Sequence, residues 1–216
     1  MTKYDVVIFD MDGTLVDSKV DLTASVNFVR NKKGLPPLTA VEVVEAINGS
    51  VGELSKKFYN TKTYYKEDRE IFEEHYFTQC IKNIKVYGGI FEVLDVLKKN
   101  NYKLAIATNA PTKFAEKMIK STNLYDYFDH IKGYDGDIPP KPSPHILFYL
   151  MEKFSSGKKV NTSIFIGDNE SDLLAAEAAG ISSIIALWGF GFKDTYGKIC
   201  NKAYNPEDII KYIINS

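Results

Sequence analysis

Short, continuous apolar runs recur along the chain and alternate with segments of helical periodicity. The runs occupy residues 6–9, 103–108, 163–167 and 183–187, with a weaker run at 130–134. Helical spacing of apolar residues marks 91–99, 113–120, 146–153 and 172–179, and Gly180 is placed as a C-terminal cap of the last helix. Strands and helices in alternation predict an α/β fold with a doubly wound parallel sheet, because parallel strands need crossover connections.

The stretch between residues 19 and 85 departs from this alternation. It has no strongly apolar or alternating strand run, and it is predicted as several amphipathic helices with breaks at 34–37 and 48–49. The sheet pattern resumes after the glycine pair at 88–89. The sequence therefore predicts two domains, a Rossmann-like core of residues 1–18 and 86–216 and a small all-helical cap domain of residues 19–85 inserted after the first strand.

Composition and charge indicate a globular protein without a nucleic-acid or membrane surface. The 216 residues are 44% hydrophobic, which allows one good core and a small second unit. The formal net charge is −1, with Lys and Arg spread along the chain, so no basic face is predicted. No run approaches the roughly 20 apolar residues of a membrane span, and the first strand leaves no room for a signal peptide, so a cytoplasmic location is expected. Cys80 and Cys200 form no metal or disulfide pattern and are expected to be buried thiols.

Polar residues that can carry chemistry follow the predicted strands at their C-terminal ends. In a parallel sheet these ends meet at one edge, where open α/β proteins bind ligands. Several carboxylates gathered there would repel one another unless a cation neutralised them, and hard oxygen ligands with open water positions favour Mg²⁺. The residues are Asp10, Asp12, Thr108, Asn109, Lys141, Asp168 and Asp172.

These residues, in this order, resemble the four motifs of the haloacid dehalogenase superfamily, in its phosphatase branch with a helical cap. Residues 10–15 (DMDGTL) resemble the nucleophile motif, Thr108 the second motif, Lys141 the third, and residues 167–172 the acidic fourth. The resemblance implies a Mg²⁺-dependent phosphatase that hydrolyses a small phosphomonoester through an aspartyl-phosphate intermediate.

The resemblance also implies catalytic and metal-binding roles. Asp10 would be the nucleophile, and Asp12 the general acid and then the general base, which requires a raised pKa for Asp12. The metal would be held by Asp10, by Asp12 through its backbone carbonyl, and by Asp168.

Four further residues are given phosphate-binding or supporting roles by the same resemblance. Thr108 and Asn109 would donate hydrogen bonds to phosphoryl oxygens, and Lys141 would supply a positive charge to Asp10 and the phosphate. Asp172 would support the metal shell or Lys141 indirectly.

A finer similarity, to phosphoglycolate phosphatases, lies in residues 87–89, 141–144 and 175–180, and makes 2-phosphoglycolate the first candidate substrate. Asn48 and Gly49 resemble the cap loop that contacts substrate in those enzymes. Asp17 and Ser18 are expected to cap the first cap helix. Residues 189–191 (GFG) are expected to form a flexible loop near the site entrance, with no assigned role.

Three other functions use a similar set of residues. A sugar-phosphate mutase of the same superfamily shares both N-terminal aspartates and the cap, and would depend on a sugar bisphosphate. A response-regulator receiver domain also combines acidic residues, Mg²⁺, Thr and Lys on a parallel sheet, although its phosphoacceptor lies on a later strand. An inactive interaction protein on this fold would bind Mg²⁺ without turnover. For the enzymatic functions the expected partner is a small phosphorylated metabolite, and the sequence predicts no oligomeric state.

Overall fold

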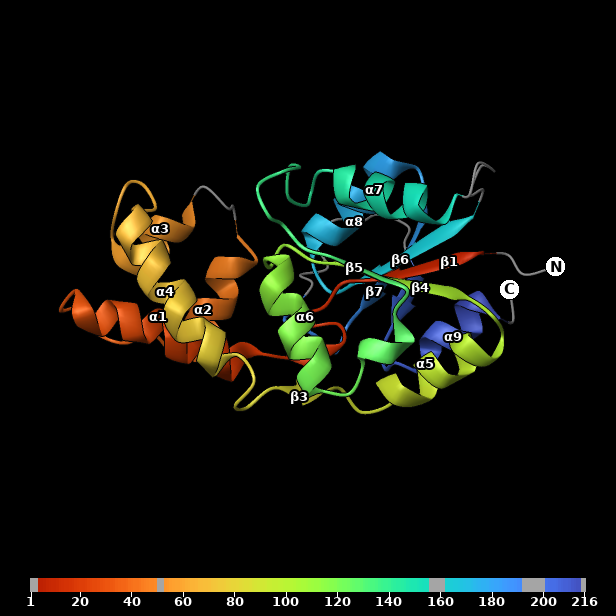
Figure 1. Ribbon diagram of the computed structural model, residues 1–216, viewed down its shortest axis with the longest axis horizontal. Helices are drawn as coiled ribbons and strands as arrows, with labels where there is room; N and C mark the ends of the chain where they lie inside the picture. Colours follow the sequence, from red (N-terminus) through yellow and green to blue (C-terminus); the bar gives the residue numbers. More distant parts are fainter. Residues whose placement is uncertain (1–3, 50–52, 156–161, 192–200, 215–216) are drawn as a thin grey trace. The chain divides into compact units, whose positions relative to one another are not determined.

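The computed structural model describes residues 4–49, 53–155, 162–191 and 201–214. Six parallel strands form one sheet in the order β5-β4-β1-β6-β7-β8 (Figure 1). All four residues of β1 (Val6–Phe9) are buried, because this strand pairs with β4 on one side and β6 on the other. The other strands are β4 (Lys103–Ala107), β5 (His130–Lys132), β6 (Ser163–Gly167), β7 (Ser182–Ala186) and β8 (Asn201–Ala203).

Helices cover both faces of this sheet (Figure 1). α7 (His145–Phe154) and α8 (Glu170–Ala179) pack on one face, where their apolar side chains join those of β1, β4 and β6 in one core cluster. The other face carries α5 (Ile90–Lys99), α6 (Thr112–Ser121) and α9 (Asp208–Ile213), with the short 3₁₀ helix η2 (Tyr125–Tyr127) against α5 and α6. Because the chain winds in opposite directions on the two sides of β1, a ligand crevice is expected at the C-terminal end of that strand.

Residues Asp17–Lys85 form a second compact unit, and the remainder of the chain forms the sheet unit. The second unit contains α1 (Lys19–Lys32), α2 (Ala40–Ile47), α3 (Leu54–Tyr59) and α4 (Lys66–Gln79), which share a small apolar core. The two connections between the units pair as the short strands β2 (Val16–Asp17) and β3 (Lys85–Val86).

Buried polar contacts hold the helical unit together. The carboxylate of Asp21, on α1, accepts hydrogen bonds from the Gln79 amide and from both the backbone and the side chain of Asn83. Thr39, which is exposed, begins α2 with a capping box: its hydroxyl accepts from the Glu42 N–H, and the Glu42 carboxylate accepts from the Thr39 N–H. The contacts of buried Asp21 satisfy a carboxylate that burial would otherwise leave unpaired.

The predicted α/β class with a doubly wound parallel sheet is confirmed, and most predicted boundaries differ from the observed ones by one or two residues. Gly180 does end α8, with φ +69°. The C-terminal elements β8 and α9 were missing from the prediction. β8 has the sequence NKA at the sheet edge, so it shows no apolar run, and α9 spans only six residues.

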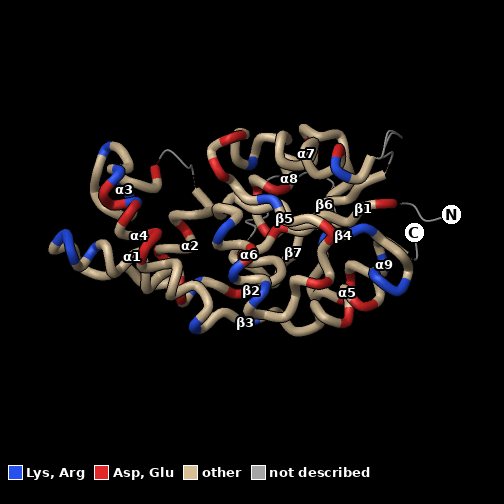
Figure 2. The backbone as a smooth tube through the Cα atoms, in the orientation of Figure 1, with Lys and Arg blue, Asp and Glu red and all other residues tan. Residues whose placement is uncertain are grey.

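Lys and Arg are interspersed with Asp and Glu along the backbone of both units (Figure 2). In the parts of the chain that the structure describes, no helix combines the length and apolar character needed to cross a membrane. Cys80 is a buried thiol, as predicted, whereas Cys200 lies outside the described residues.

Candidate active site

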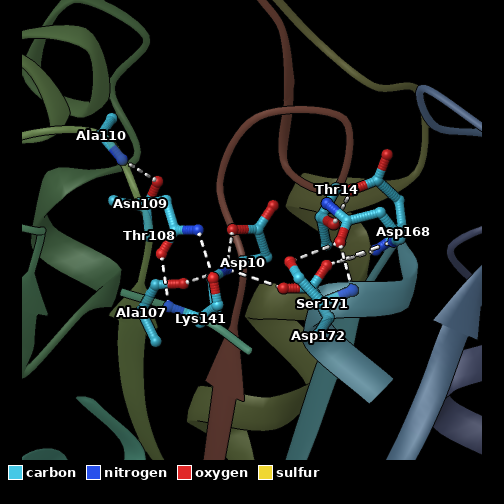
Figure 3. A network of polar contacts seen from close by, with 11 residues as sticks. Asp10, Thr14, Ala107, Thr108, Asn109, Ala110, Lys141, Asp168, Ser171 and Asp172 are labelled. Atoms are coloured by element: carbon cyan, nitrogen blue, oxygen red, sulfur yellow. Dashed lines mark hydrogen bonds and ion pairs between the residues drawn. The ribbon is translucent and has the colours of Figure 1, made fainter. Parts of the chain in front are cut away.

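The loop that follows β1 carries the first two aspartates. Backbone N–H groups later in this loop donate to the carbonyl of Met11 and close a tight turn. Asp10 is buried, whereas Asp12 is half-buried. Gly13 has φ +87° in the turn, a conformation that glycine adopts at little cost. The turn places the Asp10 carboxylate at the C-terminal end of the central strand (Figure 3).

Two further aspartates follow β6. Asp168 comes directly after the strand, and Asp172 lies in the first turn of α8; both are buried. The Asn169 side chain accepts a hydrogen bond from the Ser171 N–H, while Asp172 Oδ2 accepts from the N–H groups of Asp168 and Asn169 at 3.1 and 3.2 Å. This capping box brings both carboxylates to Asp10, and ligand atoms of the three aspartates lie within 4.8 Å of one another.

Lys141, between β5 and α7, places its ammonium group among these carboxylates (Figure 3). Its Nζ contacts Oδ1 of Asp10, and it donates to Oδ1 of Asp172 at 2.7 Å and to the carbonyl of Ala107 at 2.9 Å. An ammonium group has three donors, so these acceptors use all of them. The predicted support of Lys141 by Asp172 is therefore a direct ion pair rather than an indirect effect.

Thr108 and Asn109 follow β4, on the opposite side of Asp10 from Asp168 (Figure 3). Thr108 is buried, and its hydroxyl oxygen accepts from the Ala110 N–H at 3.1 Å, which leaves the hydroxyl proton for another acceptor. The Asn109 side chain instead binds the main chain of Lys141. Its Nδ2 donates to the Lys141 carbonyl at 3.0 Å, and its Oδ1 accepts from the Lys141 N–H at 2.8 Å.

The sequence predicts that Asn109 donates to phosphoryl oxygens, and this role stays a prediction. Both polar ends of its amide are engaged by Lys141, a residue 32 positions later in the sequence. The side chain therefore positions Lys141, and the second hydrogen on Nδ2 is left for another acceptor.

Burial controls the electrostatics of the cluster. Burial, opposed by the charge of Lys141 and assisted by Asp172 and Asp12, raises the pKa of Asp10 to about 7. Burial and the charges of Asp10 and Asp172 raise the pKa of Asp168 well above its usual range. Burial by itself would lower the pKa of Lys141, but the ion pairs with Asp10 and Asp172 outweigh it and raise that pKa.

These carboxylates form a donor set that fits a divalent cation. One lysine charge leaves the three buried aspartates with excess negative charge. The sequence assigns metal ligation to Asp10 and Asp168, and this assignment stays a prediction. Both oxygens of Asp172 accept hydrogen bonds, from Lys141 and from two backbone N–H groups. Hard carboxylate oxygens in small number suit Mg²⁺.

Sequence reasoning missed the segment after β7 as a part of this site. The Phe190 N–H donates to Oδ2 of Asp168 at 2.7 Å, and the indole N–H of Trp188 donates to the Thr14 carbonyl at 3.1 Å. The available signal was Gly189, since a glycine just after a strand can mark a close approach of two backbones.

The predicted cap residues lie in the helical unit. Asn48 is the C-cap of α2 and Gly49 follows it, while residues 50–52 lie outside the described part of the chain. Their contact with substrate stays a prediction. Ser18 occupies the N-cap position of α1 without a side-chain cap hydrogen bond, and Asp17 accepts from the Lys19 N–H at 3.2 Å, so only Asp17 gives the predicted kind of contact.

Comparisons with known proteins agree with this geometry. The chain is 32% identical over 185 residues to a phosphoglycolate phosphatase of Aquifex aeolicus (strain VF5), covering 86% of this chain and 85% of the relative. It is also 32% identical over 192 residues to phosphoglycolate phosphatase 1 of Pseudomonas aeruginosa, covering 85% and 70%. The crystal structure of a predicted phosphoglycolate phosphatase from Haemophilus somnus 129pt superposes with a TM-score of 0.84 at 27% identity, covering 98% of this chain and 99% of that one.

The family-level match includes the aspartates, Thr108, Asn109 and Lys141, and ends just before Trp188. The sequence model of the haloacid dehalogenase-like hydrolases matches residues 7–186, from the first strand to the end of β7. This range contains both loops that carry the aspartates, Thr108 and Lys141. It supports the hydrolase interpretation over the receiver-domain interpretation. The chain therefore belongs to the haloacid dehalogenase-like hydrolase family.

Proposed function

We propose that this protein is a Mg²⁺-dependent phosphatase that hydrolyses a small phosphomonoester, with 2-phosphoglycolate as the first candidate substrate. The observation that carries the proposal is the position of Asp10, a buried carboxylate at the end of the central strand, held by Lys141 beside Asp168. The phosphatase class is that of its relatives. The substrate candidate rests on their names, phosphoglycolate phosphatases at 28–32% identity.

The proposed reaction has two displacements at phosphorus. In the first, a carboxylate oxygen of Asp10 forms a bond to phosphorus while the bond to the leaving alcohol oxygen breaks, and Asp12 donates its proton to that oxygen. In the second, Asp12 takes a proton from water as the water oxygen attacks phosphorus, which releases phosphate and regenerates Asp10. Asp12 suits a proton-transfer role because it is half-buried beside Asp10 and makes part of the electrostatic field there.

The remaining groups stabilise charge. Mg²⁺, held by Asp10, Asp168 and the backbone carbonyl of Asp12, would orient the phosphoryl group and reduce its negative charge. Lys141 acts through its charge, because protein oxygens accept all three of its donors. The hydroxyl of Thr108 and an N–H group of Asn109 are the proposed donors to phosphoryl oxygens.

Mg²⁺ is expected to stabilise the protein more at about pH 8 than at about pH 5. The pKa of Asp10 is raised to about 7 and that of Asp168 is raised well above its usual range, so without metal the folded state binds more protons than the unfolded state. Without metal, ionisation of Asp10 therefore lowers stability as pH rises from about 4 to about 7, and Asp168 acts in the same direction. Protons compete with the metal at both carboxylates. At about 100-fold excess over its dissociation constant, Mg²⁺ should add ~2.7 kcal/mol at the higher pH.

Thermal unfolding with Mg²⁺ or with a chelator, at both pH values, measures this effect. Asp168→Asn should lose most of the Mg²⁺-dependent stabilisation, whereas Asp126→Asn, at an exposed position, should retain it. An equal Mg²⁺ effect at both pH values would contradict proton competition at this cluster.

Asp12→Ala is expected to slow hydrolysis of alkyl phosphates by about 10²–10⁴-fold and that of p-nitrophenyl phosphate much less. An alkoxide is a basic leaving group that needs a proton, whereas p-nitrophenolate departs without one. Steady-state rates on the two substrate types, compared with Asp12→Asn, test the acid role. Equal losses on both types would show that Asp12 serves only structure or metal binding.

The function itself is tested by phosphate release from a panel of phosphometabolites that includes 2-phosphoglycolate, with Mg²⁺ present and then chelated. A single substrate well above the rest, and dependent on Mg²⁺, is the expected result. Weak release throughout, together with bisphosphate-dependent phosphoryl transfer between sugar phosphates, would replace the phosphatase proposal with a mutase.

A further inference from the structure

Three separate segments meet at Asp168 without an intervening side chain. They are the turn at residues 13–14, Asp168 itself after β6, and the segment of residues 188–190 after β7. Gly189 lies against both of the other segments: a Cβ atom built on it would lie 2.3 Å from the Gly13 carbonyl oxygen and 2.6 Å from Asp168 Oδ2. A Cβ on Gly13 would lie 2.2 Å from the same Oδ2. Neither position has room for a larger residue.

Directed hydrogen bonds join the same segments. The Phe190 N–H donates to Asp168 Oδ2 at 2.7 Å, and the Thr14 hydroxyl is 3.5 Å from Asp168 Oδ1, so the carboxylate has a donor near each oxygen. The indole N–H of Trp188 donates to the Thr14 carbonyl at 3.1 Å, which connects the segment after β7 to the turn after β1. The carboxylate of Asp168 is thereby fixed relative to the turn that carries Asp10.

We propose that Trp188, Gly189 and Phe190 are positioning residues that lock Asp168 against the turn carrying Asp10 and Asp12, and that this lock sets the affinity of the cation site. The inference rests on the proposed Mg²⁺ site and deepens it. The proposed ligands come from two segments, after β1 and after β6, and the pairing of these two strands aligns their C-terminal ends. Beyond the paired residues, a third segment, from the neighbouring strand β7, contacts both loops and fixes the Asp168 carboxylate relative to the turn. Contacts of this kind, around the ligands rather than on the metal, commonly change metal affinity by about 10–100-fold.

Direct titration of the protein with Mg²⁺ in a calorimeter tests the proposal without any use of turnover. Gly189→Ala introduces the Cβ that meets Gly13 and Asp168, and it should weaken Mg²⁺ binding by at least about tenfold. Trp188→Phe keeps an aromatic ring but removes the donor to Thr14, and it should weaken binding by about threefold or more. Gly88→Ala is the matched control, because a Cβ at Gly88 meets nothing within 4 Å, and its affinity should equal that of the unchanged protein.

A second measurement separates positioning from general damage to the fold. For Gly189→Ala the Mg²⁺ concentration that half-activates turnover should rise in parallel with the dissociation constant, while turnover at saturating Mg²⁺ should return to within about threefold of the unchanged protein. Turnover that stays low at saturating Mg²⁺, with unaltered Mg²⁺ affinity, would overturn the proposal.

The outcomes also distinguish this inference from the proposed function. Mg²⁺ affinity within twofold of the unchanged protein in both Gly189→Ala and Trp188→Phe would overturn the lock and leave the phosphatase intact. If Gly189→Ala fails to fold, Trp188→Phe alone tests the lock, and Mg²⁺ affinity within twofold of the unchanged protein would overturn it. Absence of Mg²⁺ binding in the unchanged protein would overturn the cation site, and the lock with it, before any variant is compared.

Discussion

Asp10→Asn is expected to lower phosphatase turnover by at least about 10⁴-fold while the protein stays folded. An amide oxygen is a poor nucleophile, so the covalent step is lost, although Asn has nearly the same shape and can still accept from Lys141. Stability near neutral pH should not fall. The pKa of Asp10 is raised to about 7, which means that burial of its ionised form already costs free energy that the neutral amide does not.

The comparison needs phosphate-release rates together with circular dichroism and thermal unfolding of the same samples. Asp126→Asn makes the same chemical change at an exposed position and should behave like the unchanged protein. Mass spectrometry of acid-quenched reactions should find a phosphoryl group on the peptide containing Asp10 only in proteins that retain this aspartate. Near-normal turnover of Asp10→Asn would remove the covalent mechanism.

Lys141→Met is expected to cost ~3–5 kcal/mol of stability near neutral pH, in addition to about 10³-fold in turnover. Methionine fills similar space but leaves the buried carboxylates of Asp10 and Asp172 without the ammonium group that both accept from. The stability loss should shrink as pH falls toward about 4, because Asp10, whose pKa is raised to about 7, is protonated there and its ion pair with Lys141 no longer contributes.

Denaturant unfolding at several pH values measures this cost. Lys99→Met, on an exposed position of α5, should change stability by no more than about 0.5 kcal/mol. Lys141→Arg keeps the positive charge and should fold, with turnover reduced because the guanidinium cannot reproduce the contacts of Lys141 with Asp10, Asp172 and Ala107. A loss in Lys141→Met that does not depend on pH would show that packing, rather than charge, is the main contribution of Lys141.

The sequence did not reveal the partner that the Asn109 side chain has in the structure. The sequence places it next to Thr108 after an apolar strand, which indicates proximity to the phosphate site. Its side-chain amide binds the backbone of Lys141, 32 residues later. The hydrophobic pattern of one strand predicts the face and the end of the sheet at which a residue lies. It does not predict which loop passes close enough to bind the side-chain amide of that residue. Only the tertiary structure shows that partner.

The segment after β7 gives a second example. Its glycines indicated a loop near the site entrance, whereas the structure shows backbone and indole N–H groups donating to Asp168 and to Thr14. In these two contacts Phe190 and Thr14 use backbone groups, which nearly every residue has. The residue types at these positions therefore could not have predicted the contacts.

The sequence by itself determined the alternating strands and helices, the position of the helical insert and the carboxylates at the strand ends. These follow from hydrophobic periodicity and from the rule that parallel strands end at one edge, both of which are local or topological properties. The tertiary structure decided that Asp172 pairs directly with Lys141, that Asn109 holds the Lys141 backbone, and that Gly189 allows a third segment to close on Asp168. Those contacts depend on distances between segments far apart in the chain, which are set by the packing of the whole sheet.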